Sequence, residues 1–200
     1  MIIIDIETTG LSPHIHAIID IAAIEFENPS NQFHARCQIR AKAQSDLEAL
    51  EYNGFTQAQL SDQTLPTTKQ TITHFHNWAK GIAEKTIAGQ NPDFDLNFLK
   101  YNYQLYGLKW IFGHRKIDQH SLAYTKAIQT NYPIPSTKNN TSGFNSDEIM
   151  KFVGLPPEPR PHNSALNGAI WETEAFSRLI HGKNLLNQFQ QHPIPDYLLS

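Results

Sequence analysis

The sequence IIIDIETTG, residues 2–10, places two acidic side chains inside a run of isoleucines that is typical of a buried β-strand. Side chains alternate across a strand, so Asp5 and Glu7 share one face, and the isoleucines between and beside them share the other. At a rise of roughly 3.3 Å per residue, the two acids lie about 7 Å apart. Charged side chains are rarely buried without a partner or a metal ion. This stretch therefore decides how the rest of the chain is interpreted.

The chain around this strand follows the pattern of one α/β domain. The predicted strands are residues 2–7, 17–26, 33–40, 86–89 and 116–117. Helical periodicity is predicted from residue 46, after a start signal at 66–67, from 91 to about 106, and at 119–129, 145–153 and 164–181. These elements predict a central mixed sheet with an antiparallel N-terminal meander, flanked by helices. We expect residues 1–182 to form the domain and 183–200 to form a tail that packs on it or extends from it.

Composition restricts the class of protein. The chain has 200 residues, a formal net charge of −3 and one cysteine, Cys37, which excludes an intramolecular disulfide and a cysteine metal cluster. No apolar run is long enough for a membrane span, and the first residues lack the basic flank and cleavage site of a signal peptide. We therefore expect a cytoplasmic protein. The acidic balance argues against a protein that coats long nucleic acid, but an enzyme that grips one end remains open.

Two other interpretations of the opening strand deserve comparison with a cation site. In the first, the acidic face of the strand is simply exposed to water. In the second, the stretch is the phosphate loop of an actin-like ATPase, but Glu7 stands where that loop needs glycine. The turn Thr8-Thr9-Gly10 favours a site, because a tight turn lets the backbone approach a ligand. Two carboxylates at this spacing can flank a pair of Mg²⁺ or Mn²⁺ ions.

The sequence DIETTG, residues 5–10, resembles the first motif of the DEDD exonuclease superfamily, the DnaQ-like 3′–5′ exonucleases. That family includes polymerase proofreading subunits, RNase T and oligoribonuclease. The resemblance implies an RNase H-like fold. A second stretch, AGQNPDFDLNFL at residues 88–99, resembles the family's second motif, with Asp95 as the matching carboxylate. Asn91 is expected to cap the helix, and the helix dipole favours an ionised acid in its first turn by about 0.3–1 kcal/mol.

The third motif matches only in part, at RPHNSALNGAIWETEAF, residues 160–176. The histidine variant of the family, called DEDDh, has His, four residues and then Asp. Here His162 is the candidate general base, because an imidazole with a pKa near 6.5 can accept a proton at neutral pH. Asn167 stands at the aspartate position. Shifting the register by one residue places Asn163 and Gly168 at the two positions, so neither register supplies a fourth carboxylate.

The resemblance implies a metal-dependent 3′–5′ exonuclease that releases nucleoside monophosphates from single-stranded or frayed 3′ ends of DNA or RNA. The implied catalytic residues are Asp5, Glu7, Asp95 and His162. The implied ligands of Mg²⁺ or Mn²⁺ are Asp5, Glu7, Asp95 and Asn167. The implied contacts to the 3′ nucleotide are Thr8, Gly10, Leu11 and Asn91.

Because Asn167 carries no charge, we expect attenuated activity and a weakly held second metal. Glu172 lies farther along the same helix, and its distance from Asn167 argues against a role at the metals. The alternative is a catalytically inactive module that binds nucleic-acid ends or a partner protein. The sequence leaves open whether the chain binds a polymerase or a second copy of itself.

Overall fold

The computed structural model describes residues 1–162 and 164–199. Asn163, which takes the histidine position in the shifted register, lies outside the described residues. The fold is built on a sheet with the strand order β3-β2-β1-β4-β5. Its strands are β1 (Ile2–Thr8), β2 (Ile18–Glu25), β3 (Gln32–Arg36), β4 (Ile87–Gly89) and β5 (Lys116–Asp118). β1 pairs antiparallel with β2 and parallel with β4, which confirms the mixed sheet and its antiparallel meander.

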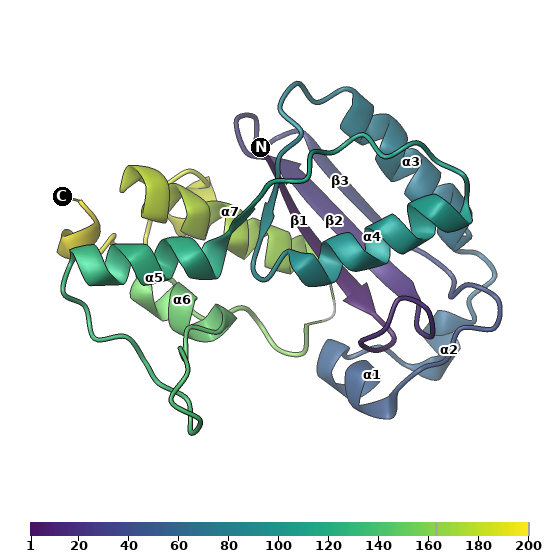
Figure 1. The fold of residues 1–200 in the computed structure, drawn as a ribbon, viewed down its shortest axis with the longest axis horizontal. Coiled ribbons are helices and arrows are strands. Elements are labelled where there is room, and N and C mark those ends of the chain that lie inside the picture. The colour runs from purple at the N-terminus through teal and green to yellow at the C-terminus, as the bar shows by residue number, and fades with distance from the viewer. Residues whose placement is uncertain (163, 200) are drawn as a thin grey trace.

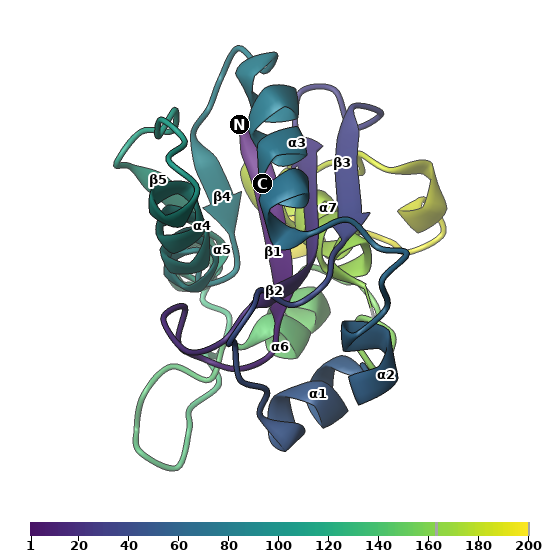
Figure 2. The same cartoon turned by 90° about the vertical axis from the view of Figure 1, so that its right-hand side faces the viewer.

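Helices cover both faces of the sheet and one end of it (Figures 1 and 2). They are α1 (Leu47–Asn53), α2 (Gln57–Leu60), α3 (Thr68–Lys80), α4 (Asp93–Leu105), α5 (Gln119–Gln129), α6 (Ser146–Phe152), α7 (Ala165–His181) and the 3-10 turns η1 (Asn187–Phe189) and η2 (Asp196–Leu198). α3 and α4 lie on one face, whereas α7 crosses the other face over β1 and β2. α1 and α2 lie near the end of the sheet toward which β1 runs.

β1 is buried on both faces, and this burial determines where its acids lie. The isoleucines at its even positions pack in one core with Phe75 of α3 and with residues of α4. On the opposite face, Ile3 packs against Phe176 of α7. Each buried aliphatic side chain of this size contributes about 1.5–3 kcal/mol. Asp5 and Glu7 follow Ile3 on the α7 face, so the packing of the isoleucines brings both acids beneath that helix.

β1 and β4 pair only near their first residues, Ile2 with Ile87 and Ile3 with Ala88. Farther along, the ladder between them ends, and the chain leaves β4 for α4 on the way to β5. β1 connects to β2 on its other side. Strand ends at which neighbouring connections diverge in this way are where open α/β sheets bind ligands. The carboxyl end of β1 is such a place.

Two local predictions were wrong by a few residues. The third strand was expected to reach residue 40, but β3 ends at Arg36 because the chain turns and Gln38 bridges to Thr67 instead. Asn91 was expected to cap α4, but Pro92 takes the N-cap position. Asn91 lies one residue earlier with a φ of 52°, a left-handed conformation that asparagine tolerates better than most residues.

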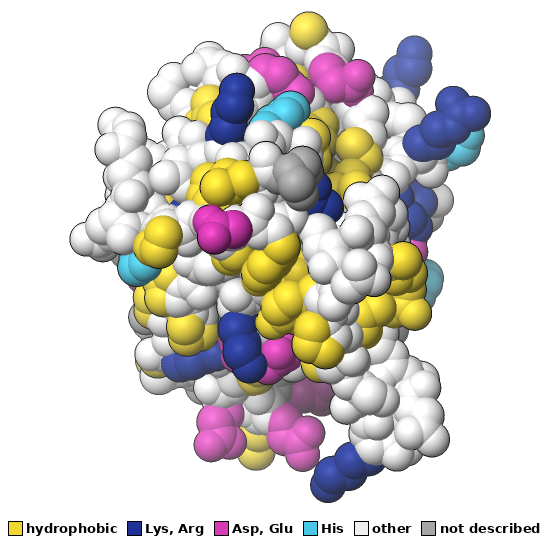
Figure 3. All heavy atoms as spheres, turned by 90° about the vertical axis from the view of Figure 1, so that its left-hand side faces the viewer, with side chains coloured by type: hydrophobic (Ala, Val, Ile, Leu, Met, Phe, Trp, Pro, Cys, Tyr) yellow, Lys and Arg dark blue, Asp and Glu magenta, His cyan; other side chains and the backbone are white. Residues whose placement is uncertain are grey.

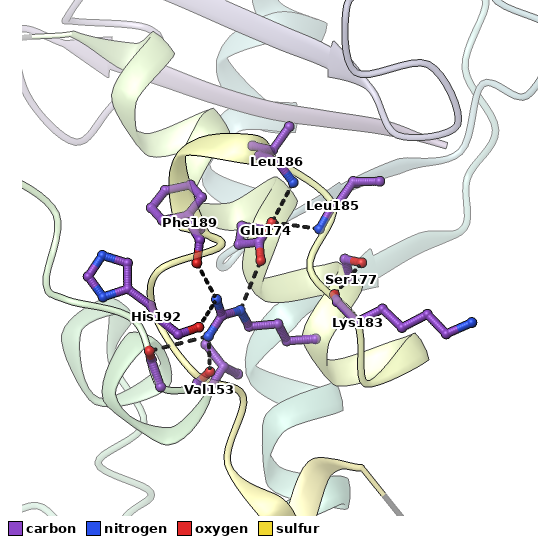
Figure 4. Close-up of polar contacts among 10 residues, drawn as sticks. Val153, Glu174, Ser177, Lys183, Leu185, Leu186, Phe189 and His192 are labelled. Carbon is purple, nitrogen blue, oxygen red and sulfur yellow. Dashed lines mark hydrogen bonds and ion pairs between the residues drawn. The ribbon is translucent and has the colours of Figure 1, made fainter.

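The C-terminal residues 183–199 pack against α6 and α7. Phe189 and Leu198 are buried in the core that these helices form. A buried ion pair within α7, between Arg178 and Glu174, also bonds to the backbone of this segment (Figure 4). The segment therefore stabilises the second half of α7.

No helix within the described residues has both the length and the hydrophobicity needed to cross a membrane. Figure 3 shows the face at the left of Figure 1, where α5, α6 and the C-terminal end lie. Among the side chains described there, acidic, basic and hydrophobic groups are intermixed. Neither sign of charge dominates this face, which agrees with the small net charge of the chain.

Candidate active site

A cavity of about 790 Å³ lies at the carboxyl end of β1. Its volume falls within the range of about 300–1,000 Å³ that is common for small-molecule sites. Its walls come from β1 and the turn after it, from α1, from the start of α4, and from the segment that runs into α7. The predicted site residues that line it are Asp5, Glu7, Thr8, Gly10, Leu11, Asn91, Asp95 and His162. Asn167 is not among the lining residues, whereas its neighbour Gly168 is.

Asp5 and Glu7 enter the cavity from β1, beneath the first half of α7. α7 comes so close to β1 that a Cβ on Gly168 would lie 2.2 Å from Oδ2 of Asp5. Glu7 is 8% exposed and pairs in register with Asp20 of β2. Asp20 itself is fully buried and contacts His34 at 2.9 Å.

Asp95 reaches the same place from the first turn of α4. Its Oδ1 accepts a hydrogen bond from the backbone N–H of Ile6 at 3.1 Å. This N–H is available because the β1–β4 ladder ends before Ile6. Because β1 and β4 diverge, the N–H of Ile6 is free of the sheet ladder. Its bond to Asp95 places this third carboxylate beside Asp5 and Glu7.

Four further acids line the cavity that the motifs did not identify: Asp46 and Glu48 at the start of α1, and the buried Glu158 and Glu172. Glu158 comes from the proline-rich segment before α7, where no periodicity indicates which side chains point inward. Glu172 comes from α7 and is 7% exposed. Glu172 lies five residues beyond Asn167, which places the two on different parts of the helix surface. It lies four residues, or one helical turn, beyond Gly168 and shares the face of α7 that lines the cavity. That spacing is the signal that could have identified it.

Glu158 holds the candidate base in place. Its Oε2 lies 2.8 Å from Nδ1 of His162, and both side chains are buried. Nε2 of His162 has no hydrogen-bond partner among the described residues. A carboxylate on one ring nitrogen fixes the tautomer and leaves the other nitrogen as a proton acceptor. Tyr52 of α1 stacks on the imidazole, with ring centroids 5.0 Å apart.

The carboxylates repel one another in a place that water reaches poorly. Burial raises the pKa of Glu7 to about 9, and the charges of Glu158, Asp20 and Asp95 add to this. Burial also raises the pKa of Asp95 to about 8, against the hydrogen bond from the β1 backbone. None of the described lining residues is a lysine or an arginine. The protein therefore provides little positive charge to offset this cluster.

The pKa values of Asp5 and Glu172 are raised well above their usual range, first by burial and then by neighbouring carboxylates. Clustered carboxylate oxygens are hard ligands that suit Mg²⁺ or Mn²⁺ better than zinc. Within residues 1–162 and 164–199, no three acidic, histidine or cysteine side chains already stand in the arrangement of a closed metal site. The donor set fits divalent cations in chemistry, and its side chains would have to rotate to close around them.

Two exposed leucines lie among the polar and acidic residues at the edge of the cavity. Leu11, in the turn after β1, and Leu47, at the start of α1, both line it and are each 81% exposed. The bonds that hold the turn between β1 and Leu11 include one from Thr8 Oγ1 to Gly10 O at 2.8 Å and one from Asn53 Nδ2 to Thr8 O at 2.9 Å. Both leucines are therefore accessible to a ligand that enters the cavity.

Comparison with known proteins agrees with this geometry. The family model RNase_T, described as "Exonuclease", matches residues 2–162. The chain is 36% identical over 188 residues to "DNA polymerase III subunit epsilon" of Rickettsia typhi, a match that covers 91% of this chain and 74% of that protein.

Solved structures show the same fold. E. coli Exonuclease I in complex with a dA16 oligonucleotide superposes with a TM-score of 0.68 at 16% identity, covering 91% of this chain and 40% of that one. The nuclease domain of 3′hExo, a DEDDh family member bound to rAMP, superposes with a TM-score of 0.67 at 18% identity, covering 98% and 95%. The predicted RNase H-like exonuclease fold is thereby confirmed.

Proposed function

This chain belongs to the DEDD family of 3′–5′ exonucleases, and we propose that it releases nucleoside monophosphates from single-stranded or frayed 3′ ends with the help of divalent cations. The observation that carries the proposal is the meeting of Asp5, Glu7, Asp95 and His162 around one cavity, from three separate parts of the chain. An acidic cavity with two exposed leucines in its lining suits the end of a strand, because cations bound to the acids would meet the phosphate and the leucines could contact the base.

Asp5, Glu7 and Asp95 would hold the cations, because they are the acids that the β1 strand and the start of α4 bring together. Divalent cations bound there would polarise the scissile phosphate and stabilise the charge that develops on the leaving 3′ oxygen. We assign Mg²⁺ or Mn²⁺ from the oxygen-rich donor set. Asn167 remains a candidate ligand only if its side chain moves toward the cavity that it does not line.

His162 would accept the proton of the attacking water at Nε2, the ring nitrogen with no hydrogen-bond partner in the described part of the chain. Glu158 is a positioning residue, because its bond to Nδ1 holds the ring and favours the tautomer with a free Nε2. Proton transfer by a positioned side chain typically contributes about 10²–10⁴-fold to a rate.

Thr8, Gly10, Leu11 and Asn91 would contact the terminal nucleotide, since all four line the cavity near its acids. Stacking of a base on a side-chain surface is tolerant of sequence, which suits an enzyme that removes any nucleotide. The related structures hold a DNA oligonucleotide in one case and rAMP in the other. We therefore propose a single-stranded 3′ end as the substrate and leave the sugar to experiment.

The match to a polymerase III subunit supports a further proposal, that the chain works beside a polymerase. A reducing, cytoplasmic setting suits Cys37, which is buried and unpaired. Attenuation through Asn167 also stays a prediction, and the charge that Glu158 and Glu172 add to the cavity argues against a large effect.

The test is hydrolysis of a single-stranded oligonucleotide labelled at its 5′ end, with DNA and RNA run side by side in Mn²⁺ or Mg²⁺. We expect a ladder of products shortened from the 3′ end, released mononucleotides, and complete inhibition by EDTA. Asp5→Asn should abolish the ladder, whereas Glu84→Gln, an exposed acid outside the cavity, should not. Binding of the oligonucleotide without cleavage by the wild type in both metals would support the inactive module instead.

A further inference from the structure

We propose that Glu172 supplies the fourth acidic ligand of the cation site, in place of the side chain at position 167. The inference rests on the proposed function, because it concerns the same cavity and the same cations. One juxtaposition on α7 carries it: Gly168 lies against Asp5, and Glu172, one turn farther along the helix, lines the same cavity.

Position 167 lies beside the face of α7 that closes the cavity. α7 contributes Gly168 and Glu172 to the lining, and Asn167 is half-buried elsewhere. Successive residues of an α-helix are rotated by about 100°, whereas residues four apart lie nearly above one another. An acid at position 167 would have to reach around the helix, and an acid at position 172 does not.

Glycine at position 168 lets the backbone of α7 approach Asp5. A Cβ there would lie 2.2 Å from Oδ2 and 2.8 Å from Cγ of Asp5, closer than such atoms approach in proteins. An acid at this position, as the shifted register requires, could be accommodated only if Asp5 or the helix moved. The missing side chain therefore permits the close approach of α7 to β1, which brings the next turn of the helix to the cavity.

The carboxylate of Glu172 receives a backbone hydrogen bond from Gln90, but no lysine or arginine among the described residues that line the cavity offsets its charge. The side chain is 7% exposed, and its Oε2 has no hydrogen-bond partner within the described part of the chain. The side chain of Gln119 donates a hydrogen bond to the backbone oxygen of Glu172 at 3.1 Å, and this bond does not involve the carboxylate. Burying a carboxylate without a compensating positive charge is costly, so a purely structural role would call for a different residue.

The surroundings of this carboxylate are those of the cation site. A Cβ on Gly89, the last residue of β4, would lie 3.4 Å from Oε2 of Glu172 and 2.9 Å from the backbone oxygen of Ile4. The acid therefore sits at the end of β4, beside β1. Repulsion from Asp95 contributes to the raised pKa of Glu172, and Glu172 in turn contributes to that of Asp5. The three carboxylates act on one another directly.

With Glu172, the site holds four carboxylates from three elements: two from β1, one from α4 and one from α7. The charge missing at Asn167 is then present one turn beyond Gly168. This arrangement implies that both cations are held by full negative charges, and that activity does not depend on an unusually high metal concentration.

Mn²⁺ binding to the full chain tests this proposal without reference to activity. Isothermal titration calorimetry and the electron paramagnetic resonance signal of free Mn²⁺ give the number of bound ions and their affinities. We expect Glu172→Gln to weaken the affinity for at least one ion by about tenfold or more, because a charged ligand is lost. Glu84→Gln removes the same charge outside the cavity and should bind as the wild type does. Asn167→Asp, added to Glu172→Gln, should not restore the affinity.

Folding is checked by the melting temperature without metal, which we expect Glu172→Gln to leave unchanged or raise. Should this variant fail to fold, Glu172→Asp keeps the charge, shortens the reach and should still weaken binding. The inference is overturned if Glu172→Gln binds Mn²⁺ like the wild type while Asp5→Asn does not, or if Asn167→Asp restores binding. Absence of Mn²⁺ binding and of hydrolysis in the wild type itself would instead overturn the proposed function.

Discussion

Glu172 and Glu174 lie two residues apart on α7, and both are buried, but only Glu174 of the two forms an ion pair within the described residues. Oε1 of Glu174 accepts a bond from Nε of Arg178 at 2.9 Å, and Oε2 accepts the backbone N–H groups of Leu185 and Leu186 at 2.9 and 2.8 Å (Figure 4). Oε2 of Glu172 has no partner among the residues described. In the second half of α7, Arg178 compensates the buried charge of Glu174. In the first half, no described cationic side chain compensates the charge of Glu172.

Arg178 completes this second half of the helix. Its guanidinium donates to the backbone oxygens of Val153 at 2.9 Å, Phe189 at 3.2 Å and His192 at 2.9 Å, so that α6, α7 and the C-terminal segment are joined through one side chain. The presence or absence of an ion pair thus distinguishes a buried acid that stabilises the fold from one that is available to bind a ligand. Stability explains Glu174, whereas the cluster around Glu172 has the donor set of a cation site.

The largest effect on stability is expected in the second half of α7, where Arg178 pairs with Glu174. Arg178→Met should lower the free energy of unfolding by about 3–5 kcal/mol, because it leaves the buried carboxylate of Glu174 without its cation. Urea denaturation followed by circular dichroism measures this. The activity of the fraction that remains folded should be near normal. A variant as stable as the wild type would show that Glu174 is no better compensated than Glu172.

Asp5→Asn should have the opposite effect to Arg178→Met, with a large loss of activity and no loss of stability. A unit charge at about 4 Å is worth on the order of 4 kcal/mol at an effective dielectric constant of 20, so kcat/KM should fall by roughly 10³-fold. Without metal, the melting temperature should stay the same or rise, because a half-buried acid crowded by other carboxylates is neutralised. Steady-state hydrolysis and thermal unfolding of the same preparation test both halves of this prediction. Unfolding comparable to that of Arg178→Met would contradict it.

The pH dependence of the metal-free protein separates the two regions further. Burial raises the pKa of Glu7 to about 9 and that of Asp95 to about 8, from 4.5 and 3.8. Between these values the folded protein holds protons that the unfolded chain releases, so the free energy of unfolding falls as the pH rises from about 4 to 9. We expect a melting temperature that declines across this range in EDTA and a gain from Mn²⁺ that grows with pH. A metal-free melting temperature that rises with pH would be inconsistent with an uncompensated cluster.

A smaller effect is expected at the positioning residue. Glu158→Ala should lower kcat by about 10–100-fold with little change in KM, because the ring of His162 loses the bond at Nδ1. Glu158→Gln keeps an acceptor oxygen and should recover part of this loss. Equal loss in both variants would indicate that the charge of Glu158, and not its hydrogen bond, is what the site needs.

Much of the fold follows from local patterns in the sequence. The isoleucines around Asp5 predict a strand that is buried on both faces, and the start signal at Thr67 correctly locates α3, where its side chain completes a capping box. The end of β3 could not be predicted, because it depends on where Gln38 finds Thr67 across the fold.

Some residues of the site can also be predicted from local sequence patterns, whereas others cannot. Asp5, Glu7 and Asp95 stand in short motifs whose spacing already indicates a shared purpose. Glu158 lies among prolines without periodicity, and Glu172 gains its position only through the close approach of Gly168 to Asp5. That approach is a tertiary contact between segments more than 160 residues apart, which no local pattern contains.

Anomalous diffraction from a crystal grown or soaked with Mn²⁺ tests the central claim most directly, because it locates the ions themselves. The account predicts peaks within ligand distance, about 2.0–2.4 Å, of Asp5, with Asp95 and Glu172 turned toward them and Glu174 still bound to Arg178. Peaks elsewhere on the molecule, with the acids at positions 5, 95 and 172 unchanged and free of metal, would contradict it.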